Sequence, residues 1–163
     1  MTQPLQKTLE LATAAHGEQT RKYSNDLYIT HPIRVAKRIE EEGGSECQIA
    51  AALLHDVIED TEVTIEQLRV ALHKIWTSQD AEYILKMVIE LTDVFVKQDF
   101  PLLNRKARKL LEARRLGGIS KEAKQIKFAD IKDNQDSIGL NPDFAKVWNQ
   151  EKEVILSYLR GQL

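Results

Sequence analysis

The chain has 163 residues, 42% hydrophobic and 29% charged, which is enough for one sizeable core, so we predict a single domain over residues 1–163. A formal net charge of -2 argues against a general nucleic-acid binder, which needs excess cations to displace counterions from phosphates. Because Cys47 is the only cysteine and the first residues lack the apolar run of a signal peptide or membrane span, we expect a cytoplasmic protein without disulfides or a membrane partner.

Helical patterns cover most of the chain, and capping residues mark where the helices begin. A first helix is expected from Thr2 or Pro4 to Ala15, and a second from Pro32 to Gly43-Gly44. The next N-termini are predicted at two capping boxes, Ser45 with Gln48 and Thr64 with Gln67, and then at Ser78, Ser120 and Asn141-Pro142. Since no run of alternating β-branched residues occurs, we predict an all-α multi-helix bundle without a sheet.

The segment from Ala51 to Thr61 places four ionisable side chains where an apolar stripe should continue. If the segment is helical, steps of about 100° per residue bring His55, Asp56, Glu59 and Asp60 within roughly 140° of arc. Three acids repel one another unless a cation holds them, which predicts a divalent metal bound by His55 and Asp56. Glu59 and Asp60 then remain available to position a water molecule or take its proton.

Two further positions offer ligands that complete such a site. His31 precedes an amphipathic stretch, and Asp130 lies in the run Lys-Phe-Ala-Asp, with Asn134 one helical turn later. Two imidazoles and two carboxylates suit Mn, Fe, Co, Ni or Zn in a site that keeps positions open for water and substrate. We therefore expect a metal site in a cleft of the helical core.

His31, then His55-Asp56, then Asp130, in this order, resembles the metal-binding pattern of the HD phosphohydrolase superfamily. The runs 15–16, 19–22, 27–32 and 55–61 are similar to the hydrolase domain of the RelA/SpoT alarmone enzymes and their single-domain homologues. The resemblance spans about His16 to Asn134. It implies a compact HD-domain bundle that cleaves guanosine 3′,5′-bis(diphosphate), the alarmone ppGpp of the stringent response. The implied products include pyrophosphate from the 3′ position, and the implied cofactor is manganese.

The same resemblance implies a role for individual residues. The metal ligands would be His31, His55, Asp56 and Asp130. The residues that act on the attacking water would be Glu59 and Asp60, and those that contact the nucleotide would be Arg21, Lys22 and Asn134. After Asp130 the family pattern is lost, because Ile131 replaces a cation, and Asp133 and Asp136 add negative charge.

These departures leave the substrate open, and two alternatives remain beside the alarmone hydrolase. One is an HD phosphatase or nucleotidase acting on another nucleotide or on a phosphorylated dinucleotide cofactor. The other is a non-catalytic module that binds a nucleotide through the metal, although Glu59 and Asp60 argue against it because binding alone gains nothing from extra acids. A homo-oligomer is also possible on the sequence.

A basic stretch from Asn104 to Arg115 has two interpretations. It can be a solvated helix face, or Arg105, Lys106 and Arg108 can steer an anionic substrate toward the metal. A nucleic-acid partner is less favoured, because aromatic residues for base stacking are absent around it. The preceding stretch from Thr92 to Leu103 is expected to be a loop near the site that closes over the substrate.

Overall fold

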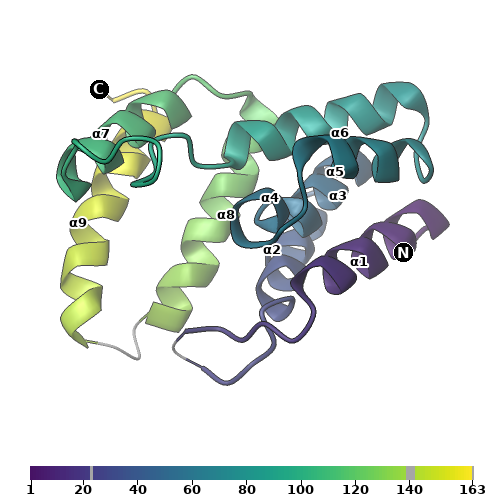
Figure 1. Ribbon diagram of the computed structural model, residues 1–163, viewed down its shortest axis with the longest axis horizontal. Helices are drawn as coiled ribbons and strands as arrows, with labels where there is room; N and C mark the ends of the chain where they lie inside the picture. The colour runs from purple at the N-terminus through teal and green to yellow at the C-terminus, as the bar shows by residue number, and fades with distance from the viewer. Residues whose placement is uncertain (23, 139–141, 163) are drawn as a thin grey trace.

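The computed structural model describes residues 1–22, 24–138 and 142–162 and shows a helical protein (Figure 1). The elements are α1 (Gln3–His16), α2 (Thr30–Glu41), α3 (Glu46–Leu54), α4 (Val57–Asp60), α5 (Ile65–His73), α6 (Ser78–Leu91), α7 (Arg105–Leu116), α8 (Lys121–Ile138) and α9 (Pro142–Leu159). Within the described residues, extended pairing is limited to one isolated bridge between Thr20 and Leu27. The prediction of an all-α fold is therefore confirmed.

Helix α3 lies at the centre of the bundle. Every side chain from Gln48 to Leu54 is buried, and α1, α2, α6 and α8 all pack against this helix. From Ile49 to Leu54 the helix is apolar on all sides, and such a segment is stable only when neighbours enclose it. The three alanines 50–52 let those neighbours approach closely. The residues that follow α3 are consequently placed deep in the molecule.

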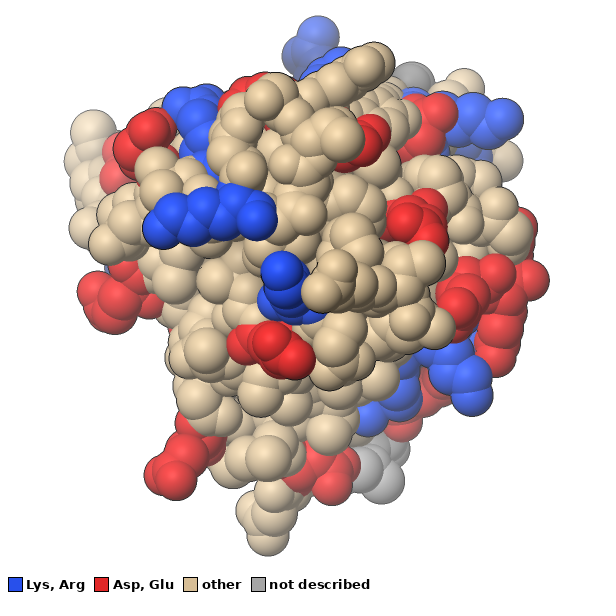
Figure 2. Space-filling view, turned by 90° about the vertical axis from the view of Figure 1, so that its right-hand side faces the viewer, with Lys and Arg blue, Asp and Glu red and all other residues tan. Residues whose placement is uncertain are grey.

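Helices α7 and α9 form the end of the molecule that lies opposite α1 in Figure 1, and they pack against each other. Helix α8 lies between this end and the rest of the bundle, since it packs on α9 as well as on α2, α3 and α6. Figure 2 views the molecule from the end opposite to α7 and α9, and acidic and basic side chains are interspersed on the face it shows. None of the helices, as far as they are described, is long and apolar enough to cross a membrane.

Local capping signals fix several helix starts. Ser45 accepts a hydrogen bond from the Gln48 N–H at 3.2 Å, and the Gln48 side chain accepts one from the Ser45 N–H at 3.0 Å. Thr64 and Gln67 form the same reciprocal pair, so both predicted capping boxes are confirmed. The predicted cap of α6 was one residue off, because Thr77 accepts the Asp80 N–H and Ser78 is already helical.

The helix that was expected to carry the His-Asp pair ends before it. Helix α3 stops at Leu54, His55 and Asp56 form a turn, and α4 resumes for four residues. A continuous helix would offer the Ala52 carbonyl to the Asp56 N–H, whereas here that carbonyl accepts a hydrogen bond from Nδ1 of His55 at 2.8 Å. The side chain thus competes with the helix at the point where the metal ligands are expected.

Candidate metal and catalytic site

Four predicted ligands from separate parts of the chain meet in the core. His31 lies in the first turn of α2, His55 and Asp56 lie in the turn between α3 and α4, and Asp130 lies on α8. Nε2 of His31 is 3.5 Å from Oδ2 of Asp56 and 3.2 Å from Oδ1 of Asp130. Nε2 of His55 is 3.2 Å from Oδ1 of Asp56 and 3.8 Å from Oδ1 of Asp130. Two imidazole nitrogens and two carboxylates therefore face one point.

Both imidazoles are oriented by a partner on their other nitrogen. Nδ1 of His31 lies 2.7 Å from Oδ2 of Asp133, and Nδ1 of His55 lies 2.8 Å from the Ala52 carbonyl. A proton on each Nδ1 leaves each Nε2 with a lone pair directed at the cluster. Nε2 of His55 is buried without a hydrogen-bond partner, and the ligand atoms of His31, His55 and Asp56 lie within 4.8 Å of one another. This donor set fits a divalent transition metal.

The charges around the imidazoles demand a cation. Burial lowers the pKa of His55, but the negative charges of Asp56 and Asp130 outweigh burial and raise it to about 9. At His31, burial likewise lowers the pKa, but the hydrogen bonds to Asp130 and Asp133 outweigh burial and raise it. The carboxylates that raise these two pKa values also attract a metal ion, which would displace a proton from each Nε2 on binding.

Asp130 is held on both sides. Lys127, one turn earlier on α8, places its Nζ 2.9 Å from Oδ2 of Asp130, and Asn134, one turn later, donates to Oδ1 at 2.5 Å. Burial would raise the pKa of Asp130, but Lys127 and the two imidazoles hold it well below its usual range. The carboxylate consequently stays charged and fixed, as a metal ligand must be.

The acid pair lies beside the cluster and is linked to it by a tyrosine. The hydroxyl of Tyr28 is 2.8 Å from Oδ2 of Asp56 and 2.6 Å from Oδ2 of Asp60. Desolvation and the charge of Asp56 raise the pKa of Asp60, while the Tyr28 hydrogen bond opposes them. One face of Glu59 is open to solvent, yet desolvation and the nearby Asp93 raise its pKa to about 7. Both acids thus have raised pKa values, as groups that accept and release protons in active sites often do.

Two of the predicted nucleotide contacts lie next to the metal cluster. The guanidinium of Arg21 lies 5.5 Å from the centre of the Tyr28 ring and donates to Oδ1 of Asn134 at 2.8 Å. Since Asn134 also donates to Asp130, the structure connects Arg21 to the site through one amide. Lys22 lies on the same segment and is exposed.

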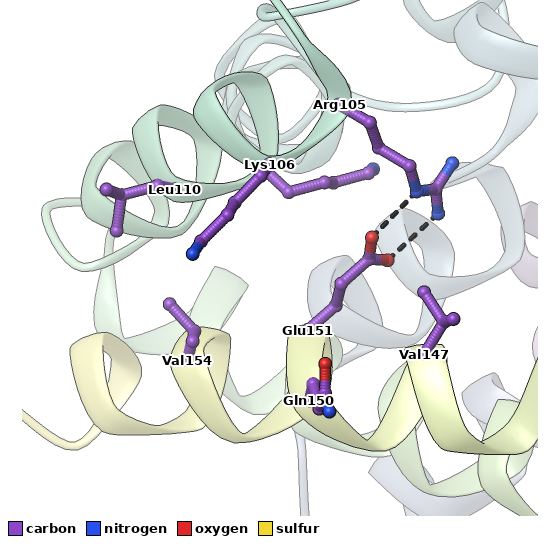
Figure 3. Close-up of a pocket in the computed structure, with 8 residues that line it drawn as sticks. Arg105, Lys106, Leu110, Val147, Gln150, Glu151 and Val154 are labelled. Atoms are coloured by element: carbon purple, nitrogen blue, oxygen red, sulfur yellow. Dashed lines mark hydrogen bonds and ion pairs between the residues drawn. The ribbon is translucent and has the colours of Figure 1, made fainter.

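A cavity of about 180 Å³ opens at the site, and two residues of the stretch from Asn104 to Arg115, Lys109 and Glu112, line it. The lining residues are Tyr28, Asp56, Glu59, Asp60, Asp93, Lys109, Glu112, Leu116, Lys127, Asp130, Ile131, Asn134, Trp148 and Ile155. Arg105 and Lys106 line a different groove, between α7 and α9, which Lys109 also lines. Arg105 bonds to Glu151 across this groove (Figure 3). Arg108 donates to the Leu103 carbonyl. The described side chains thus place Lys109 at the metal cavity, while the substrate role of Arg105, Lys106 and Arg108 stays a prediction.

Two acids after Asp130 were expected to add negative charge beside the substrate, but in the structure both pair with arginines of α2. Asp133 accepts two hydrogen bonds from Arg34 on α2, at 2.7 and 2.9 Å, as well as contacting His31. Asp136 pairs with Arg38 one turn further along α2, at 3.0 Å. Both carboxylates are therefore matched by arginines of the neighbouring helix, which the sequence alone did not reveal.

Sequence reasoning assigned no role to several residues of the site. Tyr28 lies in a recognised run, but nothing local indicated that its hydroxyl reaches two acids 28 and 32 residues away. Lys127 carried a usable signal, because a lysine in an apolar stretch one turn before a ligand predicts a buried ion pair. Asp93 and Lys109, which pair at 2.9 Å, belong to a loop and a basic run whose direction depends on packing.

Comparisons with known proteins agree with this geometry. A family model described as HD domain matches residues 8–117. The chain is 34% identical over 122 residues to the Xenopus tropicalis protein named guanosine-3′,5′-bis(diphosphate) 3′-pyrophosphohydrolase MESH1, covering 73% of this chain and 60% of that relative. It is 51% identical over 53 residues to a Synechocystis protein named as a probable enzyme of the same activity, covering 32% of this chain and 7% of the relative.

A solved structure is also similar over nearly the whole length. It is that of a metazoan ortholog of SpoT, described as hydrolysing ppGpp and playing a role in starvation responses. The TM-score is 0.79 at 26% sequence identity, with coverage of 99% of this chain and 88% of that one. The chain spans less than two thirds of the curated relatives named above. The family model nevertheless covers more than half of the chain and includes three of the four clustered ligands, so the chain belongs to the HD domain family.

Proposed function

We propose that this chain is a Mn²⁺-dependent hydrolase of guanosine 3′,5′-bis(diphosphate) that releases pyrophosphate from the 3′ position. The observation that carries the proposal is the convergence of His31, His55, Asp56 and Asp130, with Glu59 and Asp60 directly beside them. Support also comes from the names of the relatives and from the activity ascribed to the similar solved structure, all of which concern this reaction.

In this proposal the clustered imidazoles and carboxylates hold the metal. When bound, a divalent cation supplies positive charge that polarises a phosphoryl oxygen and acidifies water. Asp133 and the Ala52 carbonyl keep the two imidazoles in the tautomer that binds a cation through Nε2. Lys127 and Asn134 keep Asp130 charged and fixed. The protein therefore arranges the ligands before any substrate arrives.

Glu59 and Asp60 orient the attacking water and take its proton. Water adds to the phosphorus at the 3′ position, the bond from that phosphorus to the 3′ oxygen breaks, and the oxygen leaves with a proton as the hydroxyl of GDP. Tyr28 holds Asp60 through its hydroxyl and restricts that carboxylate to the side of Asp56. General acid–base groups held in this way contribute about 10²–10⁴-fold to a rate.

The remaining contacts bind the nucleotide. Arg21, over the face of Tyr28, and Lys22 hold the purine end, and Asn134 lies beside the ribose. Arg105, Lys106 and Arg108 on α7 attract the anionic substrate through their positive charge. A small nucleotide substrate requires no nucleic-acid or membrane partner, and we propose a cytoplasmic enzyme on this basis.

The proposal is tested with a nucleotide panel in the presence of Mn²⁺, measuring phosphate and pyrophosphate separately. Guanosine 3′,5′-bis(diphosphate) should yield pyrophosphate and GDP in equal amounts, and chelation of the metal should stop the reaction. Robust turnover of another nucleotide with the alarmone untouched would replace the substrate and keep the phosphohydrolase chemistry. Metal-dependent binding without turnover of any nucleotide would instead indicate a binding module.

A further inference from the structure

The cavity at the metal site is strongly acidic. Its lining includes six carboxylates, on Asp56, Glu59, Asp60, Asp93, Glu112 and Asp130, and two ammonium groups, on Lys109 and Lys127. A divalent metal leaves this excess of negative charge only partly balanced. A substrate with several phosphate charges enters such a site only if a cation of the protein reaches it directly.

Lys127 is already paired with Asp130, one of the proposed metal ligands. Its ammonium pairs with Oδ2 of Asp130 at 2.9 Å, and its side chain is largely buried. Moving this ammonium to a substrate would leave Asp130 uncompensated in the core, which is costly.

Lys109 is free of that constraint. Its side chain is 35% exposed, and its Nζ pairs with Oδ2 of Asp93 at 2.9 Å. Partly exposed pairs of this kind are weak because water screens them, so an incoming phosphate can compete for the ammonium. The N–H of Asp93 donates to Oε2 of Glu59 at 3.1 Å, which places the pair directly next to the acids that act on water.

We propose that Lys109 is the substrate-binding cation of this cavity, and that it contacts a phosphoryl oxygen other than those held at the metal ligands. The inference rests on the proposed function for the class of substrate. It predicts that the site selects nucleotides carrying a diphosphate at the reacting position, because a single phosphate held at the metal has no group that extends to Lys109.

Matched variants separate this role from the general charge of the region. Lys109→Met removes the ammonium, and Lys109→Arg keeps the charge. Lys132→Met is the control, since Lys132 is an exposed lysine two residues after Asp130 that does not line the cavity. Lys106→Met tests the alternative cation suggested by the sequence. Lys106 lines the groove of Figure 3 but does not line the cavity at the metal site.

Binding is measured without turnover in full-length protein carrying Glu59→Gln and Trp76→Phe, with Mn²⁺ present. Trp148 then remains the only tryptophan and borders the cavity, so its fluorescence reports binding of guanosine 3′,5′-bis(diphosphate) or inorganic pyrophosphate. Lys109→Met should weaken binding of both ligands by about 10-fold or more, as expected for a lost charged hydrogen bond. Lys109→Arg should recover most of the affinity, and Lys132→Met should change it by less than about 2-fold.

The outcomes distinguish the two proposals. If Lys109→Met weakens binding while the unmutated protein hydrolyses no nucleotide, the hydrolase assignment fails and Lys109 remains the anion-binding residue. If the unmutated protein hydrolyses the alarmone but Lys109→Met binds as tightly as Lys132→Met, the inference about Lys109 is wrong. An equal loss for Lys109→Met and Lys106→Met would also overturn it, in favour of diffuse attraction by the basic helix.

Discussion

Two arginine–carboxylate pairs with nearly the same geometry lie in two different regions of the molecule. Arg34 donates two hydrogen bonds to Asp133 at 2.7 and 2.9 Å, and Arg105 donates two to Glu151 at the same distances. The first pair touches a metal-site imidazole and has a carboxylate that is 2% exposed. The second pair bridges α7 and α9 near the surface.

The contrast shows how one bundle divides its tasks. On the side of α2, α3 and α8, each metal-site residue has a further fixed partner, so the positions of the reacting groups are set in advance. On the side of α7 and α9, cations are paired at or near the surface and can exchange partners. In the proposed hydrolase, rigid placement would serve the chemistry, and exchangeable charge would serve the arrival of an anion.

The largest effect is expected from removing a ligand on the rigid side. His55→Ala should abolish metal content and activity together, because it removes one imidazole from the shell and leaves neighbouring acids without their cation. Metal analysis of purified protein and the pyrophosphate assay measure this. Full metal occupancy in the variant would exclude His55 as a ligand.

A smaller loss is expected when the ligands stay and the proton acceptor changes. Glu59→Gln keeps the shape of the side chain but removes its carboxylate, so turnover should fall by about 10²-fold or more while metal and nucleotide still bind. Single-turnover kinetics at saturating nucleotide measure the step. Unchanged turnover would assign the proton transfer to Asp60.

The partner of His31 comes next in size and has a matched control on the same helix. Asp133→Asn weakens the hold on His31, and metal affinity should fall by about 10–100-fold. Asp136→Asn removes the exposed partner of Arg38, and both metal affinity and stability should stay within about 0.5 kcal/mol. Mn²⁺ titrations of the two variants measure this difference in metal affinity. An equal loss of affinity in both variants would show that the negative charge matters and that the contact with His31 does not.

The smallest effect is expected from the surface pair. Glu151→Gln should cost less than about 1 kcal/mol of unfolding free energy, because the Arg105 side chain is 54% exposed and water replaces much of the interaction. A thermal melt should shift by no more than about 4 °C. A shift well above about 4 °C would remove the distinction between the two regions.

Local signals in the sequence predicted local structure well. The box formed by Ser45 and Gln48 is found as expected because both hydrogen bonds join residues three apart. The four predicted ligand residues were chosen by type and order, and the structure brings them together, although their role as ligands stays a prediction. The break after Leu54 was missed, because it depends on how the His55 side chain turns back to the Ala52 carbonyl.

Contacts between residues far apart in the chain could not be predicted from the sequence. Counting charges after Asp130 indicated added negative charge near the substrate, whereas Asp133 and Asp136 pair with arginines almost a hundred residues earlier in the chain. In the basic run, the direction of each side chain depends on how α7 rotates when it packs on α9, so Lys109 could not be separated from its neighbours by spacing. The hydrogen bond from Tyr28 to Asp60 could not be predicted either, because it forms only when α4 packs next to Tyr28.

The buried, unpartnered Nε2 of His55 has a consequence for how much of the protein a cell maintains in the folded form. Carboxylates gathered around that atom would be stabilised by a bound cation, so under the proposed function metal supply would act on folding as well as on catalysis. At a free metal concentration 100 times the dissociation constant, the bound ion would add about 2.7 kcal/mol to stability. Under the proposed function, scarcity of the metal would therefore reduce the folded amount of the protein together with its rate of hydrolysis.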